Sequence, residues 1–252
     1  MREAMLSLIM HRDVIPELLY RQQTNTRHTP TSGMEVEELT ALAMGPSATG
    51  VSDYILALRA RGRSAEMLCL GLLTVAARRL GERWLDDSCA FTEVTIGTWR
   101  LHDAMRLLCR GERVALCPQV RRALLVPLPG EHHTFGVTML MEFFKWSGWQ
   151  AISGIDTSAE LAHVVGAIHI DLVGLSLSSD SFLDAAKLEI GCLRAASCNR
   201  ALVVMVGGNP FLGRRELARE IGADDTADDA ATAVDRAEQL VAQACAEPLT
   251  IA

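Results

Sequence analysis

The residues of this chain that could most directly hold a metal or another ligand stand in the segment 124–140, LLVPLPGEHHTFGVTML. An apolar run enters a loop with proline and glycine, Glu131, His132 and His133 follow, and an apolar helical pattern then resumes. Histidine is the commonest metal ligand among the side chains, yet two adjacent histidines in a loop are more often plain solvated sequence. The position of this loop in the fold decides between the two interpretations.

The sequence pattern after residue 120 predicts a parallel β-sheet. Short apolar runs bounded by glycine, proline or serine alternate with helical stretches, which is typical of βαβ units with helices on both faces. Residues 222–226 would add only a degenerate edge strand, because GADDTADDA is too acidic for a central one. We therefore expect an α/β fold with a flavodoxin- or Rossmann-like, doubly wound sheet of five strands. The other expected strands are 122–128, 149–154, 169–177 and 201–208, and the expected helices are 135–147, 157–166, 181–197, 209–221 and 228–246.

Such a sheet has a preferred place for its ligand. Ligands bind beyond the carboxyl ends of the strands, where the strand order reverses, and in a flavodoxin-like order this point lies between the first and third strands. The loops PGEHHTFG and SLSSD follow these two strands, and GGNPF follows the fourth. Two glycines permit close approach of a ligand to the backbone. The histidine loop is thus expected where this fold binds its ligand.

The sequence ahead of the sheet predicts a small helical bundle. Apolar residues recur at three- and four-residue spacing from 35 to 111, in four helical stretches joined by short turns. Ser52 and Ser64 are expected to cap two of these helices at their N-termini. Residues 1–23 could form a short amphipathic helix, followed at 24–33 by TNTRHTPTSG, a polar stretch with helix-breaking residues that is typical of a linker. The expected division is an N-terminal segment and linker at 1–30, a bundle at 31–117 and the sheet domain at 120–252.

Composition excludes several classes of function. The formal net charge is −7 at pH 7, which argues against direct nucleic-acid binding, because phosphate contacts require a basic surface. The seven cysteines are odd in number and lack zinc spacing, as expected of reduced thiols. The most apolar segment, AEMLCLGLLTVAA, is shorter than the ~20 residues that span a bilayer. We therefore expect a cytoplasmic protein without membrane contact.

Three short motifs in order resemble those of cobalamin-binding domains. The stretch from Glu131 to Gly136 is similar to the family's Asp-x-His-x-x-Gly motif, with Glu in place of Asp. Residues 176–178, Ser-Leu-Ser, resemble the Ser-x-Leu motif with the Leu lost, and Gly207-Gly208 resembles the Gly-Gly motif. A bundle directly ahead of such a domain is the arrangement of methionine-synthase-like modules, and GERWLDDSCAFTEVTIG is similar to their Gly-x-x-Trp segment followed by a Glu. The resemblance covers about residues 35–250.

The resemblance implies cobalamin as the cofactor, in its hydroxo-, methyl- or adenosyl- form. In the family the motif histidine, here His133, displaces the dimethylbenzimidazole base and becomes the lower axial ligand of cobalt. A carboxylate behind an imidazole fixes its tautomer and raises its basicity, which is the role implied for Glu131. The tryptophan is implied to lie over the upper face of the corrin. The residues expected at the cofactor are Trp84, Glu93, Glu131, His132, His133, Thr134, Gly136, Ser176, Ser178, Gly207 and Gly208.

A further histidine, His102, is expected in the bundle core. It falls on a helical stripe with Phe91, Thr95, Thr98 and Met105, which would be the buried face of a regular helix. The default interpretation is a satisfied core histidine rather than a cobalt ligand.

Three functions compete for this architecture. The runs WLDDSCAFTEVTIGTWRLHDAM, PGEHHTFGVTML and GGNPF resemble the AerR/PpaA antirepressors of photosynthetic bacteria, which implies a light-responsive regulator whose partner is a DNA-binding repressor of the CrtJ/PpsR type. The related photoreceptors carry a Glu-His pair where this chain has Val94 and Thr95, so their upper-ligand mechanism does not carry over. The alternatives are a corrinoid methyl carrier serving a methyltransferase and a sensor that holds haem in the same pocket. We expect no catalysis by the chain alone, since the sequence shows no nucleophile–base arrangement, Walker loop or GxGxxG.

Overall fold

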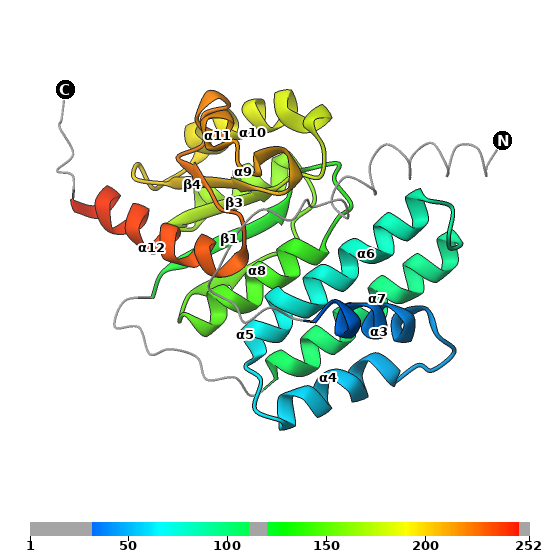
Figure 1. Ribbon diagram of the computed structural model, residues 1–252. Coiled ribbons are helices and arrows are strands. Elements are labelled where there is room, and N and C mark those ends of the chain that lie inside the picture. Colours follow the sequence, from blue (N-terminus) through cyan, green and yellow to red (C-terminus); the bar gives the residue numbers. More distant parts are fainter. Residues whose placement is uncertain (1–31, 111–119, 247–252) are drawn as a thin grey trace. The chain divides into compact units, whose positions relative to one another are not determined.

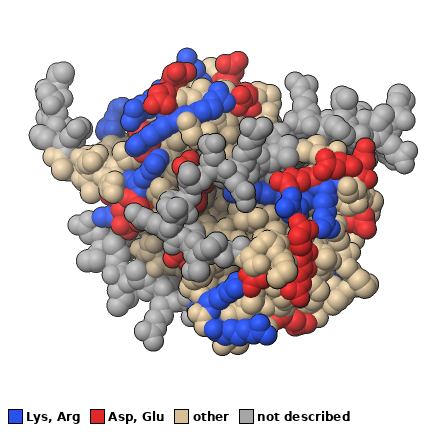
Figure 2. All heavy atoms as spheres, viewed as in Figure 1, with Lys and Arg blue, Asp and Glu red and all other residues tan. Residues whose placement is uncertain are grey.

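The computed structural model describes residues 32–110 and 120–246, and the chain divides into two compact units, 1–113 and 114–252 (Figure 1). The amphipathic helix expected at 1–23 and its linker lie outside the described residues. Within the described ranges, no helix is both long and apolar enough to cross a membrane. On the face shown in Figure 2, basic and acidic side chains of the described residues are interspersed.

The described part of the first unit consists of four helices, as expected. They are α3 (Gly33–Met44), α4 (Gly50–Ala60), a long helix made of α5 (Ala65–Leu68), a π-helical turn (Cys69–Leu73) and α6 (Thr74–Leu85), and α7 (Phe91–Cys109). Ser64 caps α5 by accepting a hydrogen bond from the N–H of Met67. Ser52 does not cap α4, because that helix begins two residues earlier.

The buried face of α7 differs in register from the expected stripe. Phe91 is 44% exposed and Thr95 is exposed, whereas the buried stripe runs through Val94, Gly97 and Leu101. At Gly97 an added Cβ would lie 2.9 Å from Cδ1 of Leu80 on α6, so the two helices pack on a glycine. A sequence pattern based on large apolar side chains does not detect a buried face that contains a glycine. The expectation that Phe91 and Thr95 are buried was wrong.

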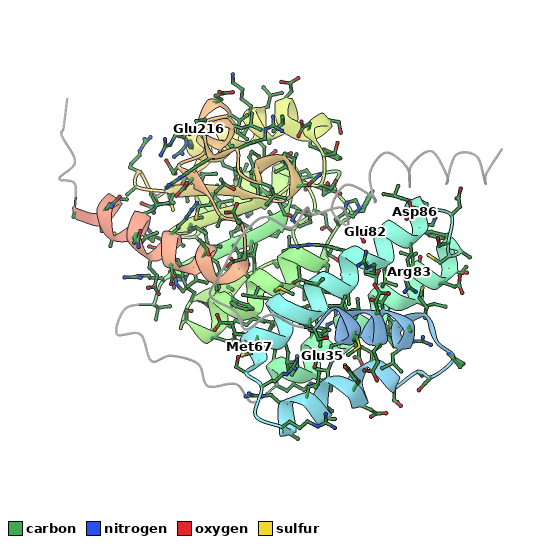
Figure 3. The ribbon with its side chains drawn as sticks, in the orientation of Figure 1. Glu35, Met67, Glu82, Arg83, Asp86 and Glu216 are labelled. Carbon is green, nitrogen blue, oxygen red and sulfur yellow. The ribbon has the colours of Figure 1, made fainter. Side chains whose placement is uncertain are left out.

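Charged side chains fasten the helices of the first unit to one another. Arg83, near the end of α6, donates to Glu37 of α3 at 2.5 Å, and Arg63 donates to Glu35 at 2.5 Å. Figure 3 labels Arg83 and Glu35. Arg100 of α7 donates to the carbonyls of Ala43 and Gly45 and so satisfies the end of α3. The contact with Glu37 holds Arg83, the residue before Trp84, in place.

The second unit is a five-stranded parallel sheet, which confirms the predicted fold class. Its strands are β1 (Arg122–Pro127), β2 (Gln150–Ile152), β3 (Leu172–Ser176), β4 (Val203–Gly207) and β5 (Asp225–Thr226), in the order β2-β1-β3-β4-β5. All neighbouring pairs are parallel. The order reverses between β1 and β3, so the carboxyl ends of these strands mark the expected ligand edge.

Helices cover both faces of this sheet (Figure 1). Helices α8 (Phe135–Trp146) and α12 (Ala230–Ala246) pack together on one face, and α9 (Ser158–Ala167), α10 (Leu183–Ala196) and α11 (Arg215–Glu220) lie on the other. The expected helix at 209–221 is in fact a 3-10 turn (Asn209–Phe211) followed by the short α11, because Gly213, with a φ of +63°, separates the two.

The fifth strand is the degenerate edge that its acidic sequence predicts, and ion pairs make its burial possible. The side chain of Asp225 is 3% exposed and forms a bidentate pair with Arg215, with both contacts at 2.6 Å. Arg236 of α12 lies 3.6 Å from the same carboxylate. Such partners offset the cost of burying a carboxylate, so an aspartate can serve in a buried strand.

Candidate functional site

A tight turn presents Glu131 at the carboxyl end of β1. Gly130 has a φ of +90°, and the N–H of Glu131 donates to the carbonyl of Leu128 at 2.8 Å. Pro129 followed by a glycine at positive φ is the composition of a type II turn. The turn reverses the chain immediately after the strand and directs the Glu131 side chain inward, where it is 1% exposed.

The Glu131 carboxylate collects five hydrogen-bond donors. Its Oε1 accepts the backbone N–H of His132 at 2.9 Å and that of His133 at 3.3 Å, and it also contacts Nδ1 of His133. Its Oε2 accepts the backbone N–H of Ser178 at 2.9 Å and the Ser178 hydroxyl. The carboxylate thus joins the loop after β1 to the loop after β3.

These contacts fix the charge of Glu131 and the tautomer of His133. Burial alone would raise the pKa of Glu131, but hydrogen bonds from His133 and Ser178 outweigh it and lower the pKa to about 2. An ionised carboxylate can only accept, so Nδ1 of His133 carries the proton that it shares with Glu131. In the neutral ring the second nitrogen, Nε2, then holds the lone pair that a metal requires. The site therefore presents an imidazole in the ligand tautomer.

The three loops at this edge are bonded to one another. The N–H of Leu128, after β1, donates to the carbonyl of Ser176 at the end of β3 at 3.0 Å. The N–H of Leu177 donates to the carbonyl of Gly207 at the end of β4, also at 3.0 Å. Ser176 and Ser178 are both buried. The three motifs, which are separate in the sequence, therefore form one continuous edge of the sheet.

The two glycines at the carboxyl end of β4, Gly207 and Gly208, have different roles. Gly208 has a φ of +105°, and an added Cβ would lie 1.9 Å from the carbonyl oxygen of Leu177, so only glycine fits there. An added Cβ at Gly207 would meet no described atom within 4 Å. Gly208 is thus required for the packing of the loops, and Gly207 is the glycine that leaves room beside the backbone.

The remaining expected residues surround this edge or lie elsewhere. His132 and Thr134 are exposed, and Thr134 accepts two hydrogen bonds from Thr138 in the first turn of α8. Gly136 follows in that turn and is partly exposed. Trp84 and Glu93 belong to the first unit, where Glu93 accepts the N–H of Ala90 at 2.7 Å and so caps α7.

His102 on α7 is half-buried. Burial, and then the nearby charge of Arg106, lowers its pKa to about 4, so the imidazole is neutral at physiological pH. Within the described ranges, no three His, Cys, Asp or Glu side chains gather as a metal-binding group. A metal held only by protein side chains usually has three or four ligands.

Sequence reasoning missed the contact between Glu131 and Ser178. It treated Ser178 as a position where the Leu of the motif was lost and Glu131 as a replacement for the Asp of the motif. The sequence did offer one indication of the contact: both residues differ from the motif, and both stand in loops that meet at the same edge of the sheet. A longer carboxylate on one loop and a hydroxyl on the other are chemically complementary.

Comparisons with known proteins find the same fold in a solved structure. No protein-family model and no curated protein matches the sequence. The monomethylamine corrinoid protein of Methanosarcina barkeri is similar in structure, with a TM-score of 0.68 and 16% identity over 83% of this chain and 100% of that chain. A cobalamin-binding protein from Desulfitobacterium hafniense DCB-2 (TM-score 0.43, 19% identity, 81% and 98% covered) and the methanol:cobalamin methyltransferase complex of Methanosarcina barkeri (0.44, 13%, 90% and 83%) also match. At 16% identity, the similarity to the monomethylamine corrinoid protein shows that the two proteins share a fold.

Proposed function

We propose that this chain binds a corrinoid, cobalamin or a close analogue, with His133 as the lower axial ligand of cobalt. The observation that carries the proposal is the buried array of His133, Glu131 and Ser178 at the carboxyl ends of β1 and β3. The array lies where a doubly wound sheet binds its ligand. The shared fold of a solved corrinoid protein, coextensive with most of this chain, supports the assignment.

The residues present fit such a cofactor. A corrin ring supplies the equatorial ligands of its cobalt, so the protein needs to add a single axial donor, and His133 is that donor. Glu131 holds Nδ1 and leaves Nε2 for the metal, as second-shell carboxylates do for ligating histidines. Gly207 leaves room beside the end of β4. When bound, the corrinoid supplies an upper coordination position that can hold an alkyl group.

The chain must move slightly to accept the metal. The Nε2 atom of His133 is buried, and the whole side chain is 10% exposed. A cobalt atom therefore reaches Nε2 only after the atoms that cover this nitrogen are displaced. Glu131 does not need to move, because its contacts are to Nδ1 and to Ser178.

Of the possible roles, we propose a methyl carrier whose partner is a methyltransferase, with no catalysis by the chain alone. The corrinoid protein that shares the fold is named for a methylamine, and its whole length is matched here. A regulator that binds a CrtJ/PpsR-type repressor is the second candidate, and it rests on the sequence runs around Trp84 and His133. Haem in place of the corrinoid is the third, because one imidazole also suits haem iron.

The test of corrinoid binding is a titration of the purified protein with hydroxocobalamin, followed by visible absorption. We expect binding with loss of the dimethylbenzimidazole ligand, and a loss of affinity of about tenfold or more in His133→Ala. His132→Ala is the matched control, because that neighbouring histidine is exposed. Unchanged affinity and spectrum in His133→Ala would refute the assignment, and binding of haemin but not of hydroxocobalamin would favour the haem alternative.

The choice between methyl carrier and regulator is tested with the protein loaded with methylcobalamin. Affinity for a CrtJ/PpsR-type repressor is measured by anisotropy, in the dark and after illumination of the methylcobalamin form. We expect no repressor binding in either state if the chain is a methyl carrier. Binding that changes with light would establish the regulator instead.

A further inference from the structure

One helix of the second unit carries a large apolar side chain that faces away from the protein core. Helix α10 buries Ala186, Ile190 and Leu193 on its inner side. Leu188 lies on the outer side and is 73% exposed. Among the large apolar side chains of the described residues, only that of Met34 is more exposed. A single exposed leucine is ordinary, so the surface around Leu188 decides whether it has a role.

The outer side of α10 around Leu188 is apolar. Ala185, Gly191 and Cys192 lie one turn from Leu188 and are exposed, and Ala195 continues the same side by another turn. An added Cβ at Gly191 would meet no described atom within 4 Å. Leu188 therefore projects beside a flat position at Gly191. These five residues are called the Leu188 face below.

Helix α9 enlarges this surface. It packs beside α10, and an added Cβ at Gly166 of α9 would lie 3.1 Å from the carbonyl oxygen of Ala196 at the end of α10. Ala159 and Ile168 of α9 are exposed. A stable protein interface buries about 800 Å² on each partner. A helix of 14 residues is only about 21 Å long and about 10 Å wide, so an interface on the Leu188 face must include α9.

The charges at the two ends of α10 are opposite in sign. Asp184 lies in the first turn of the helix and Arg194 in the last. The Arg194 side chain is 37% exposed and also pairs with Asp224 at 2.9 Å. If two copies of α10 were parallel, like charges would meet at both ends. An antiparallel pair brings each aspartate to the arginine of the other copy, and it also opposes the two helix dipoles.

We propose that the Leu188 face is the contact surface between two copies of this chain, which pair about a two-fold axis with their α10 helices antiparallel. A two-fold interface requires a surface that is complementary to itself. The Leu188 face meets this requirement, because Leu188 of each copy packs over Gly191 of the other and Asp184 of each copy faces Arg194 of the other. The pairing concerns a surface outside the proposed corrinoid site and does not depend on a bound cofactor.

The experiment is sedimentation equilibrium of the full chain over a range of protein concentrations, for wild type and Leu188→Arg. We expect the wild type to form a reversible dimer. The arginine would bury a charge at the centre of the interface, so the dimer dissociation constant should rise about tenfold or more. A thermal unfolding scan checks that the variant folds, which we expect because the substituted side chain is exposed. A wild type that stays monomeric at every concentration would overturn the proposal.

Met34→Arg is the matched control. It places the same charge on another highly exposed apolar side chain, in the first unit and away from the Leu188 face. This variant should dimerise as the wild type does. The proposal would be wrong if Leu188→Arg left the dimer unchanged, or if the two variants weakened it equally.

The antiparallel arrangement is tested by reversing a charge. Asp184→Arg would bring two positive side chains together, so the dimer should weaken several-fold, and the loss should shrink as salt is added. Glu216→Arg changes the net charge by the same amount at an exposed residue of α11, which Figure 3 labels. It lies outside the Leu188 face and should not weaken the dimer. Equal weakening by the two variants would overturn the antiparallel pairing.

Discussion

The carboxylate of Glu131 and the hydroxyl of Ser178, 47 positions apart in the chain, form a hydrogen bond between the loops that follow β1 and β3. The same carboxylate holds Nδ1 of His133. The orientation of the imidazole therefore depends on a residue in another βαβ unit, and a change in either loop reaches the candidate metal ligand. This dependence makes the charge state of Glu131 the first quantity to test.

We expect the free energy of unfolding to depend on pH because Glu131 titrates differently in the folded and unfolded protein. Burial opposes ionisation of Glu131, yet hydrogen bonds from His133 and Ser178 lower its pKa in the folded protein from an ordinary value of 4.5 to about 2. A lowered pKa stabilises the folded state fully above pH 4.5, and the contribution is lost as the pH falls toward 2. Its size at neutral pH is about 3 kcal/mol.

The measurement for this prediction is the free energy of unfolding in urea from pH 7 to pH 3, for wild type and Glu131→Gln. The difference between the two proteins should be greatest at pH 7 and should shrink steadily below pH 4.5. A difference that stays constant down to pH 3 would show that Glu131 has an ordinary pKa in the folded protein.

The two glycines at the carboxyl end of β4 should respond very differently to substitution. Gly208→Ala places a Cβ 1.9 Å from a backbone oxygen, at a positive φ, and should destabilise the protein by about 2 kcal/mol or more. Gly207→Ala meets no described atom and should change stability by less than about 1 kcal/mol. Gly207→Ala should instead weaken hydroxocobalamin binding. Denaturation curves and titrations of both variants check this, and equal stability losses would contradict it.

The buried edge strand should depend on Arg215. Arg215→Ala leaves the carboxylate of Asp225 with the more distant Arg236, and we expect a loss of about 2–4 kcal/mol. Arg214→Ala is the control, because it breaks only the exposed pair with Asp180 and should change stability by less than about 1 kcal/mol. If chemical denaturation gives similar losses for the two variants, the ion pair does not support β5.

A strained residue ends α6 three positions after Trp84. Asp87 has a φ of +53°, and the N–H of Ser88 donates back to the carbonyl of Arg83 at 2.8 Å, which is the helix-ending geometry that favours glycine. Asp87→Gly should therefore stabilise the protein by up to about 1 kcal/mol. Asp86→Gly, where φ is −82°, should destabilise it. Thermal unfolding of the two variants checks the prediction, and a lower midpoint for Asp87→Gly would contradict it.

The general architecture can be predicted from the sequence because it depends on the spacing of apolar residues and on the proline and glycine residues that end each element. The short apolar run at β1, closed by Pro129 and Gly130, identifies both a buried strand and the turn that follows it. The buried face of α7 was not predictable in the same way, because Gly97 is buried only through its fit against Leu80. The partnership of Glu131 with Ser178 also depends on a distance between loops, which no local pattern contains.

The most direct test of corrinoid binding through His133 is electron paramagnetic resonance of the protein loaded with cobalamin and reduced to cobalt(II). The unpaired electron couples to the nucleus of the axial nitrogen and splits the signal into triplets. Labelling the protein's histidines with nitrogen-15 should convert the triplets into doublets, and His133→Ala should abolish that change. Triplets that persist in the labelled protein would show that the cofactor's own base, and not His133, remains bound to cobalt.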